Sequence, residues 1–270
     1  MSRIEDALDK VSRLQERPQR YAQDKARPEQ ARGEKICPVV PKHCCVVTLA
    51  EPESLVSEEY RKIKTTISRF MLKHAKQHSL MITSCVSGEG KSLTAINLAV
   101  SMAQDVDHDV LLIDADLRRP SLAEYLGIPA APGLSECLRN EVPIASAIVK
   151  TDVRGLSFLP GGKSARNPVE ILSSSTMRSL LGELKRTAAD RILIIDTPPV
   201  LSFAETQTIG SLVDDILFVV REGAVTISDL QEALDIIDRT KLLGVVYNDV
   251  TDKNRDNRYS HYYRYYADRR

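Results

Sequence analysis

Residues suited to holding phosphate cluster in the stretch 84–92, Ser-Cys-Val-Ser-Gly-Glu-Gly-Lys-Ser, which follows the apolar run 80–83. Gly88 and Gly90 allow the backbone to curl, so that successive N–H groups point at one centre. Lys91 adds a positive charge there, and Ser92 offers a hydroxyl to a magnesium ion. A helix over 91–104 would direct the positive end of its dipole to the same place. The stretch therefore predicts a phosphate-binding loop, although Cys85 stands where the strict pattern has a first glycine.

Three acids follow two other apolar runs. Asp114 and Asp116 come after 110–113, and both would face one side if the chain stayed extended there. Asp196 comes after 192–195, the usual form of a Walker B acid that orients a metal or its waters. Each acid by itself could instead cap a helix or form a turn. Because paired acids at a strand tip repel unless a cation intervenes, the set favours magnesium on a nucleotide.

Asn248 follows the apolar stretch 244–247, and it allows two interpretations of equal weight. Its amide matches the donor–acceptor pair on an adenine edge, and asparagine is also a common turn residue.

The elements that must position these side chains alternate along the chain. Apolar runs predict strands at 79–84, 109–114, 156–160, 191–196, 215–220 and 243–247. Helical spacing predicts helices at 57–71, 91–104, 168–187 with a break, 203–212 and 226–239. The predicted fold is α/β, a mostly parallel, doubly wound sheet flanked by helices, in which ligands bind beyond the carboxyl ends of the strands.

Composition sets the outer limits. The 270 residues are 43% hydrophobic, carry no net charge and include five cysteines without metal-ligand spacing. No apolar run approaches the ~18 residues of a membrane span. The pattern indicates a cytoplasmic chain with reduced thiols, in which Cys85 is interpreted as an ordinary small residue.

Four segments are predicted. Residues 1–16 form a short amphipathic helix, 17–45 a flexible linker, 46–250 the nucleotide-binding domain and 251–270 a disordered tail. The tail holds five of the nine tyrosines of the chain: Tyr259, Tyr262, Tyr263, Tyr265 and Tyr266. It could stack on nucleic acid, or present phenols to a kinase.

Together these residues resemble the bacterial tyrosine kinases (BY-kinases), P-loop autokinases linked to exopolysaccharide synthesis. The resemblance covers 50–270 and rests on the loop 87–92, on Asp114-Ala-Asp116-Leu-Arg118, on Ile195-Asp196-Thr-Pro-Pro199, on Asn167-Pro168-Val-Glu170 and on the tyrosine cluster. The first residues, Met1-Ser-Arg-Ile-Glu-Asp-Ala-Leu, are similar to autokinases of exosortase (PEP-CTERM) gene clusters. The chain departs from the family at Ser87, where proline is usual.

The resemblance implies ATP and Mg²⁺ as cofactors and a role for each site residue. ATP is expected on Gly88, Glu89, Gly90, Lys91, Ser92, Leu93 and Asn248, and Mg²⁺ on Ser92, Asp116 and Asp196. Asp114 is expected to accept the phenol proton and Arg118 to neutralise developing charge, with Lys91 and Asp116 completing the catalytic set. The five tail tyrosines are the expected acceptors, phosphorylated in trans.

The resemblance also implies partners. A family helix that contacts the next subunit of a ring matches Glu58, Glu59 and Arg61, with Lys64 replacing a final arginine. The expected partners are further copies of the chain and a membrane activator of the chain-length-determinant type, which would hold the protein at the inner membrane face. Neither nucleic acid nor a direct membrane span is expected. The rival interpretations are a MinD/ParA-like ATPase switch, which would carry an extra lysine where Val86 stands, and a non-catalytic nucleotide-binding regulator.

Overall fold

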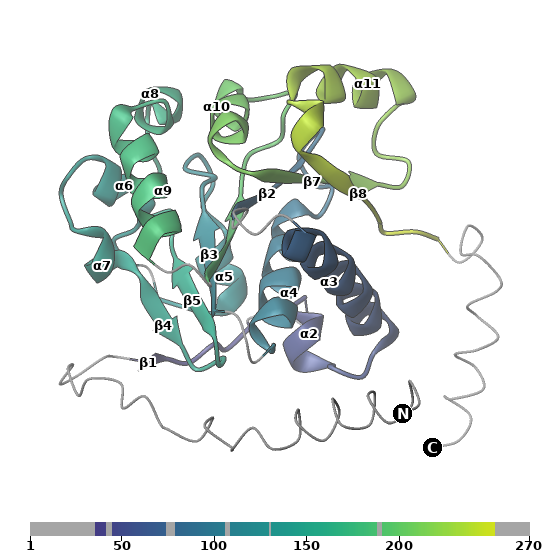
Figure 1. Cartoon of the computed structure of the whole chain (residues 1–270), viewed down its shortest axis with the longest axis horizontal. Helices are drawn as coiled ribbons and strands as arrows, with labels where there is room; N and C mark the ends of the chain where they lie inside the picture. The colour runs from purple at the N-terminus through teal and green to yellow at the C-terminus, as the bar shows by residue number, and fades with distance from the viewer. Residues whose placement is uncertain are drawn as a thin grey trace, which may run out of the picture. The chain divides into compact units, whose positions relative to one another are not determined.

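The computed structural model describes residues 36–41, 45–73, 79–105, 109–129, 131–187 and 191–251. Its core is one eight-stranded sheet in the order β1-β4-β5-β3-β6-β2-β7-β8 (Figure 1). The strands are β1 Ile36–Cys37, β2 Ser79–Ser84, β3 Asp109–Asp114, β4 Val149–Thr151, β5 Leu156–Leu159, β6 Arg191–Asp196, β7 Asp215–Arg221 and β8 Leu242–Asn248. Every pairing is parallel except that of β4 with β5.

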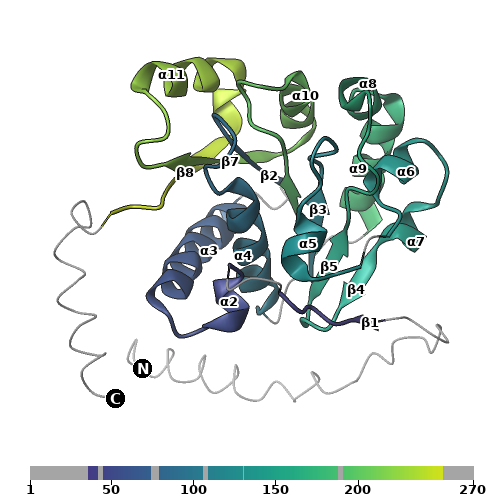
Figure 2. The ribbon, with the colours of Figure 1, turned by 180° about the vertical axis from the view of Figure 1, so that it is seen from behind.

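Helices cover both faces of the sheet because its central strands are apolar on both sides. All six residues of β2 are buried, and so are nearly all of β3, β6 and β7. One core cluster packs the sheet against α6 Leu134–Leu138, α8 Pro168–Leu172, α9 Ser175–Thr187, α10 Ala204–Leu212 and α11 Ile227–Ile236. The other packs it against α2 Val47–Ala50, α3 Leu55–Lys73, α4 Lys91–Ala103 and α5 Leu122–Leu126 (Figure 2). The predicted α/β fold is confirmed.

The sheet order brings the predicted polar segments to one edge. In the sheet, β6 separates β2 from β3, so the loops after these three strands open side by side at their carboxyl ends. Asp114 and Asp196 end β3 and β6 as partners in the same register. The site is therefore assembled from three segments that lie far apart in the sequence.

The predicted elements match closely, and each break has a local cause. All six predicted strands form, with bounds that differ by at most one residue at either end. The break predicted in 168–187 falls at Ser173–Ser174, because the Ser174 hydroxyl accepts a hydrogen bond from Met177 N at 3.1 Å and starts α9. Thr226 caps α11 by accepting from Asp229 N at 3.2 Å.

The prediction of a flexible linker over 17–45 is wrong for its end. Ile36–Cys37 form β1, an edge strand that pairs with β4, and Val39 N donates to the Asp152 carboxylate at 2.9 Å. These bonds are made by backbone atoms, so apolar periodicity does not reveal them. The strand β4 and the short helices α5, α6 and α7 Ile144–Ala147 were also missed, since elements of three to five residues have too few positions to show a period.

No helix in the described parts of the chain is long and apolar enough to cross a membrane.

Candidate nucleotide site

The phosphate loop 85–90 depends on two glycines with positive φ. Gly88 has φ +87° and Gly90 φ +91°, backbone angles that glycine adopts without strain. A Cβ added to Gly90 would lie 2.2 Å from the Asn248 amide nitrogen, whereas one added to Gly88 would meet nothing within 4 Å. Glycine is thus required at position 90 by its positive φ and by the close contact with Asn248, and at position 88 by its positive φ alone.

Glu89 and Asn248 hold this loop from behind. The buried Glu89 carboxylate accepts from Val86 N at 2.7 Å and from Arg221 N at 3.3 Å. The side-chain amide of Asn248 donates to the main-chain carbonyl of Glu89 at 2.9 Å, and the main-chain carbonyl of Asn248 accepts from Glu222 N at 3.0 Å. These bonds tie the carboxyl ends of β7 and β8 to the loop, and the contact of Asn248 with adenine stays a prediction.

The amino end of α4 opens above this loop without a side-chain cap. Gly90 is its N-cap, and no side-chain hydrogen bond satisfies the first turn, which holds Lys91, Ser92 and Leu93. Free N–H groups at a helix start attract anions. The helix end is therefore suited to a phosphate group, as the sequence predicts.

Lys91 extends from this helix toward two of the predicted acids. Its Nζ lies 3.4 Å from Asp116 Oδ2, 3.6 Å from Asp196 Oδ1 and 3.1 Å from the Ser92 hydroxyl. Burial alone would lower the pKa of Lys91, but attraction to Asp196, Asp116 and Asp114 outweighs it and raises that pKa. The lysine is therefore charged across the physiological range.

Asp114 is turned into the loop that follows its own strand. Its Oδ2 accepts from Ser121 N and Leu122 N, both at 3.0 Å, and its Oδ1 accepts from Asp116 N at 3.2 Å. Residues 115 and 116 follow β3 without a regular element, Ala115 N donates to the Asp196 carbonyl at 2.8 Å, and the chain turns at 117–118. Burial, and then repulsion from Asp196, raise the pKa of Asp114 to about 8.

Asp196 has the features of a cation ligand. It is fully buried, and neither carboxylate oxygen accepts a hydrogen bond within the described residues. Burial raises the pKa of Asp196, and the nearby Lys91 opposes that rise. A buried carboxylate with two unsatisfied oxygens fits a bound cation, because such a group otherwise carries a desolvation cost.

No group of three or more His, Cys, Asp or Glu side chains within the described ranges is arranged to hold a metal ion by itself. Mg²⁺ commonly takes one or two carboxylates and completes its shell with phosphates and water. Asp116, Asp196 and Ser92 are the residues that fit it.

Arg118 does not face these groups as predicted. Its guanidinium pairs with the fully buried Glu205 of α10, with Nη2 3.4 Å from Oε2, and stacks 4.6 Å above the Phe203 ring. No sequence pattern predicts this pair, because its members are 87 residues apart and Glu205 resembles an ordinary first-turn acid.

The predicted oligomerisation residues lie on α3 and make contacts within the chain. Glu58 pairs with Arg61, and Glu59 with Lys62 at 2.7 Å, one turn along the helix. Lys64 pairs with Asp105, just after α4, at 2.8 Å. The helical face is confirmed, whereas its contact with another subunit stays a prediction. The predicted helix 1–16 and the five tail tyrosines fall outside the described residues.

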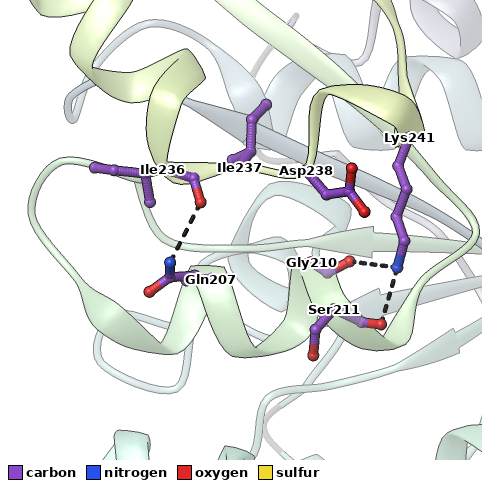
Figure 3. Close-up of a pocket in the computed structure, with 7 residues that line it drawn as sticks. All are labelled: Gln207, Gly210, Ser211, Ile236, Ile237, Asp238 and Lys241. Carbon is purple, nitrogen blue, oxygen red and sulfur yellow. Dashed lines mark hydrogen bonds between the residues drawn. The ribbon is translucent and has the colours of Figure 1, made fainter.

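A separate cavity of about 390 Å³ lies between α10 and the segment after α11 (Figure 3). Its polar side chains are engaged: Lys241 donates to the carbonyls of Gly210, Ser211 and Val213 at 3.1, 2.9 and 2.8 Å, and Gln207 to Ile236 at 3.3 Å. Lys241 precedes β8, at the amino edge of the sheet, so the cavity lies opposite the phosphate loop.

Comparison with known proteins gives the family. Residues 75–263 match a family model described as ParA, NUBPL iron-transfer P-loop NTPase. The chain is 38% identical over 205 residues to tyrosine-protein kinase YwqD of Bacillus subtilis (strain 168), covering 75% of this chain and 85% of the relative. It is 33% identical over 211 residues to tyrosine-protein kinase ptk of Acinetobacter johnsonii, covering 77% of this chain but only 28% of that longer protein.

The solved kinase domain of Escherichia coli tyrosine kinase ETK has the same fold, with a TM-score of 0.72, 26% identity and coverage of 86% of this chain and 87% of that one. The match to YwqD runs through the site described above, and it is more specific than the broad P-loop NTPase model. The chain therefore belongs to the bacterial tyrosine-protein kinases, within the ParA-type P-loop NTPase family.

Proposed function

We propose that this kinase binds MgATP on the phosphate loop and transfers phosphate to the tyrosines of its own C-terminal tail, and that it thereby regulates exopolysaccharide production. One observation carries the assignment of the site. At the uncapped start of α4, Lys91 lies within 3.6 Å of Asp116 and Asp196, and neither Asp196 oxygen accepts a hydrogen bond within the described chain. This is a receptacle for an anion and a cation together.

Each residue has a part that follows from its position. The backbone of Gly88 to Leu93 and the α4 dipole hold the phosphates, and Lys91 neutralises them. Ser92, Asp116 and Asp196 would hold Mg²⁺, which when bound supplies charge neutralisation for phosphoryl transfer. Glu89 and Asn248 fix the loop without contacting the nucleotide through their charged or amide ends.

The proton of the attacking phenol is assigned to Asp114, on the family resemblance. The carboxylate lies in register with Asp196 and is held by three backbone N–H groups, so its position is fixed. In a loose phosphoryl transition state the nucleophile loses its proton late, and orientation matters more than a matched pKa. Arg118 is assigned to positioning the loop 115–120 through Glu205 rather than to neutralising charge.

Transfer between neighbouring copies suits acceptor tyrosines that lie 15 or fewer residues beyond the described domain. The length from Thr251 to Tyr266 allows a reach of up to about 50 Å, and a high local concentration in an assembly favours encounter. Accumulated phosphate would then repel the subunits from one another. The tyrosine kinase ptk is longer than this chain. We propose that a membrane activator of the chain-length-determinant type takes the role of the additional part of such longer relatives and holds this chain at the cytoplasmic membrane face.

The match to the ParA model supports one alternative function, an ATPase switch that transfers no phosphate to tyrosine. Intact-mass measurement after incubation with MgATP separates the two. The wild-type chain should gain several phosphates. Lys91→Met should gain none, and neither should a variant in which all five tail tyrosines are phenylalanine. The matched controls Arg154→Met and Tyr247→Phe change an exposed cation and an exposed tyrosine outside the site and should behave as wild type.

ATP hydrolysis with no gain in mass, with and without added membranes, would establish the switch and reject the kinase. Thermal unfolding of each variant shows whether a loss reflects chemistry or folding. A phosphorylated sample with the same oligomer distribution as the unphosphorylated one would rule out the proposed repulsion between subunits.

A further inference from the structure

Two loops at the carboxyl edge of the sheet are joined directly. The segment 117–120 follows the acids of β3, and the segment 160–166 follows β5. Ala165 N donates to the Leu117 carbonyl and the Ser164 hydroxyl to the Arg118 carbonyl, both at 2.9 Å. A Cβ on Gly161 would lie 2.8 Å from Pro120 Cβ and 3.3 Å from the Asp114 carbonyl. The second loop therefore borders the segment that carries Asp114 and Asp116.

The position of the second loop is fixed from below by Glu136 of α6. This buried carboxylate accepts from Gly133 N at 2.8 Å and from Lys163 N at 3.1 Å. Gly162 has φ +80°, and a Cβ there would lie 1.9 Å from Glu136 Oε2. These backbone bonds lower the pKa of Glu136 even though burial opposes that change. The loop is thus a built feature with a buried anchor.

Three exposed cations stand on this joined pair of loops: Arg119, Lys163 and Arg166. Among the described residues, none of the three side chains makes an ion pair or hydrogen bond, whereas their neighbour Arg118 is committed to Glu205. The nearest acids along the chain already accept other hydrogen bonds: Asp116 from the main-chain Arg119 N at 3.1 Å, and Glu170 from the Asn167 amide at 3.3 Å. The loops therefore carry an uncompensated positive charge beside the site.

The charge of the tail changes sign during the proposed reaction. In residues 259–270, three arginines against one aspartate give a side-chain charge of +2, which the three cations repel. Each phosphate on tyrosine adds about −1.5 to −2 charge and three strong acceptor oxygens. Two phosphates therefore turn a repelled tail into an attracted one, and guanidinium groups bind phosphate in a bidentate way.

We propose that Arg119, Lys163 and Arg166 form a subsite that holds a phosphotyrosine already made on the tail while the next tyrosine reacts. The inference rests on the proposed kinase function and deepens it. Neighbouring acceptors lie one to three residues apart, so a phosphotyrosine is ~3.5 to 10 Å along the chain from the next phenol. Retention at the subsite would make successive phosphorylation of one tail faster than the first transfer.

The direct test measures binding by fluorescence anisotropy and needs no turnover. The probe is a synthetic peptide of residues 259–270, either unphosphorylated or phosphorylated at Tyr262 and Tyr265. It is titrated with the full-length chain in the presence of Mg²⁺ and a saturating non-hydrolysable ATP analogue. The phosphopeptide should bind at least ~10-fold more tightly than the plain peptide, and Arg119→Ala/Lys163→Ala/Arg166→Ala should remove most of that difference.

The matched control is Arg69→Ala/Arg154→Ala/Arg186→Ala, which removes the same charge at exposed positions outside these loops and should retain the preference. Equal binding of both peptides by the wild type, or an unchanged preference in the first triple variant, would overturn the subsite. In a second titration without the analogue, phosphopeptide that binds and is then displaced by added ATP analogue would lie on the phosphate loop, which would overturn the subsite as well. If the first triple variant lost binding to phosphatidylserine vesicles but kept phosphopeptide binding, the surface would serve a membrane and the subsite would again be overturned.

A second measurement follows intact mass through time in MgATP. In the wild type, multiply phosphorylated chains should appear with little singly phosphorylated intermediate, and in the first triple variant the singly phosphorylated chain should accumulate. No gain in mass by the wild type would reject the kinase function. Normal gain with identical intermediates in both proteins would reject the subsite alone.

Discussion

The side-chain amide of Asn248 donates to the main-chain carbonyl of Glu89 at 2.9 Å, which fastens the last strand of the sheet to the phosphate loop. The strand β8 is an edge strand, yet its final residue determines how the loop can lie, because Gly90 packs against the same amide.

Asn248→Ala should weaken ATP and GTP binding by the same factor. The hydrogen bond to the loop is worth about 1 kcal/mol, or roughly fivefold in affinity. A residue that reads adenine would instead alter the ratio of the two affinities. Isothermal titration with both nucleotides makes the distinction, with Gln207→Ala at the opposite edge as the control. A changed ATP-to-GTP ratio would show that Asn248 contacts the base.

Gly90→Ala should be more damaging than Gly88→Ala. Both substitutions place alanine at positive φ, at a cost of ~1–2 kcal/mol, but only the first also drives a Cβ into Asn248. The free energy of unfolding, measured by urea titration, should fall further for Gly90→Ala. Gly90→Ala/Asn248→Ala should recover part of the difference, because it removes the clash and leaves the angle strained. Equal losses in the two single variants would contradict the packing argument.

Cys85 should resist alkylation in the native protein from pH 7 to 9. Burial, and then repulsion from Glu89, raise the pKa of the Cys85 thiol to about 12, so the reactive thiolate is scarce in that range. The raised pKa and the burial of Cys85 favour its interpretation as an ordinary small residue. Iodoacetamide labelling mapped by mass spectrometry should modify Cys85 only after denaturation. Rapid native labelling that ATP suppresses would indicate an activated thiol instead.

Arg118→Met should destabilise the fold by about 2–3 kcal/mol, because it leaves the buried Glu205 carboxylate without its partner. The value lies below that of a fully buried pair, since the Arg118 side chain is 36% exposed and screened by water. Arg118→Met/Glu205→Gln should regain most of the loss. Urea titrations of the two single variants and the double variant give the coupling energy. Strict additivity would mean that the pair does not stabilise the loop.

The sequence by itself determined the fold class, the six main strands and the chemical identity of the site. These follow from local signals: apolar runs of strand length, glycines before Lys91, and acids at strand ends. Each of these signals lies within a few consecutive residues, and the parallel topology then places the carboxyl ends of the strands side by side. For the same reason β1, β4 and α5 to α7 could not be predicted, because backbone pairing and a few contacts suffice to form them.

Only the tertiary structure decided what each polar group faces. In the folded chain Asn248 donates a hydrogen bond to the phosphate loop, Asp114 accepts hydrogen bonds from the backbone of residues 116–122, and Arg118 forms an ion pair with Glu205. Among the described residues the tertiary structure leaves the Asp196 oxygens without a hydrogen-bond donor, and it joins the loop of Arg119 to that of Lys163 and Arg166. The physical reason is that a hydrogen bond or ion pair depends on distances of about 3 Å, which sequence separations of 87 or 159 residues do not specify.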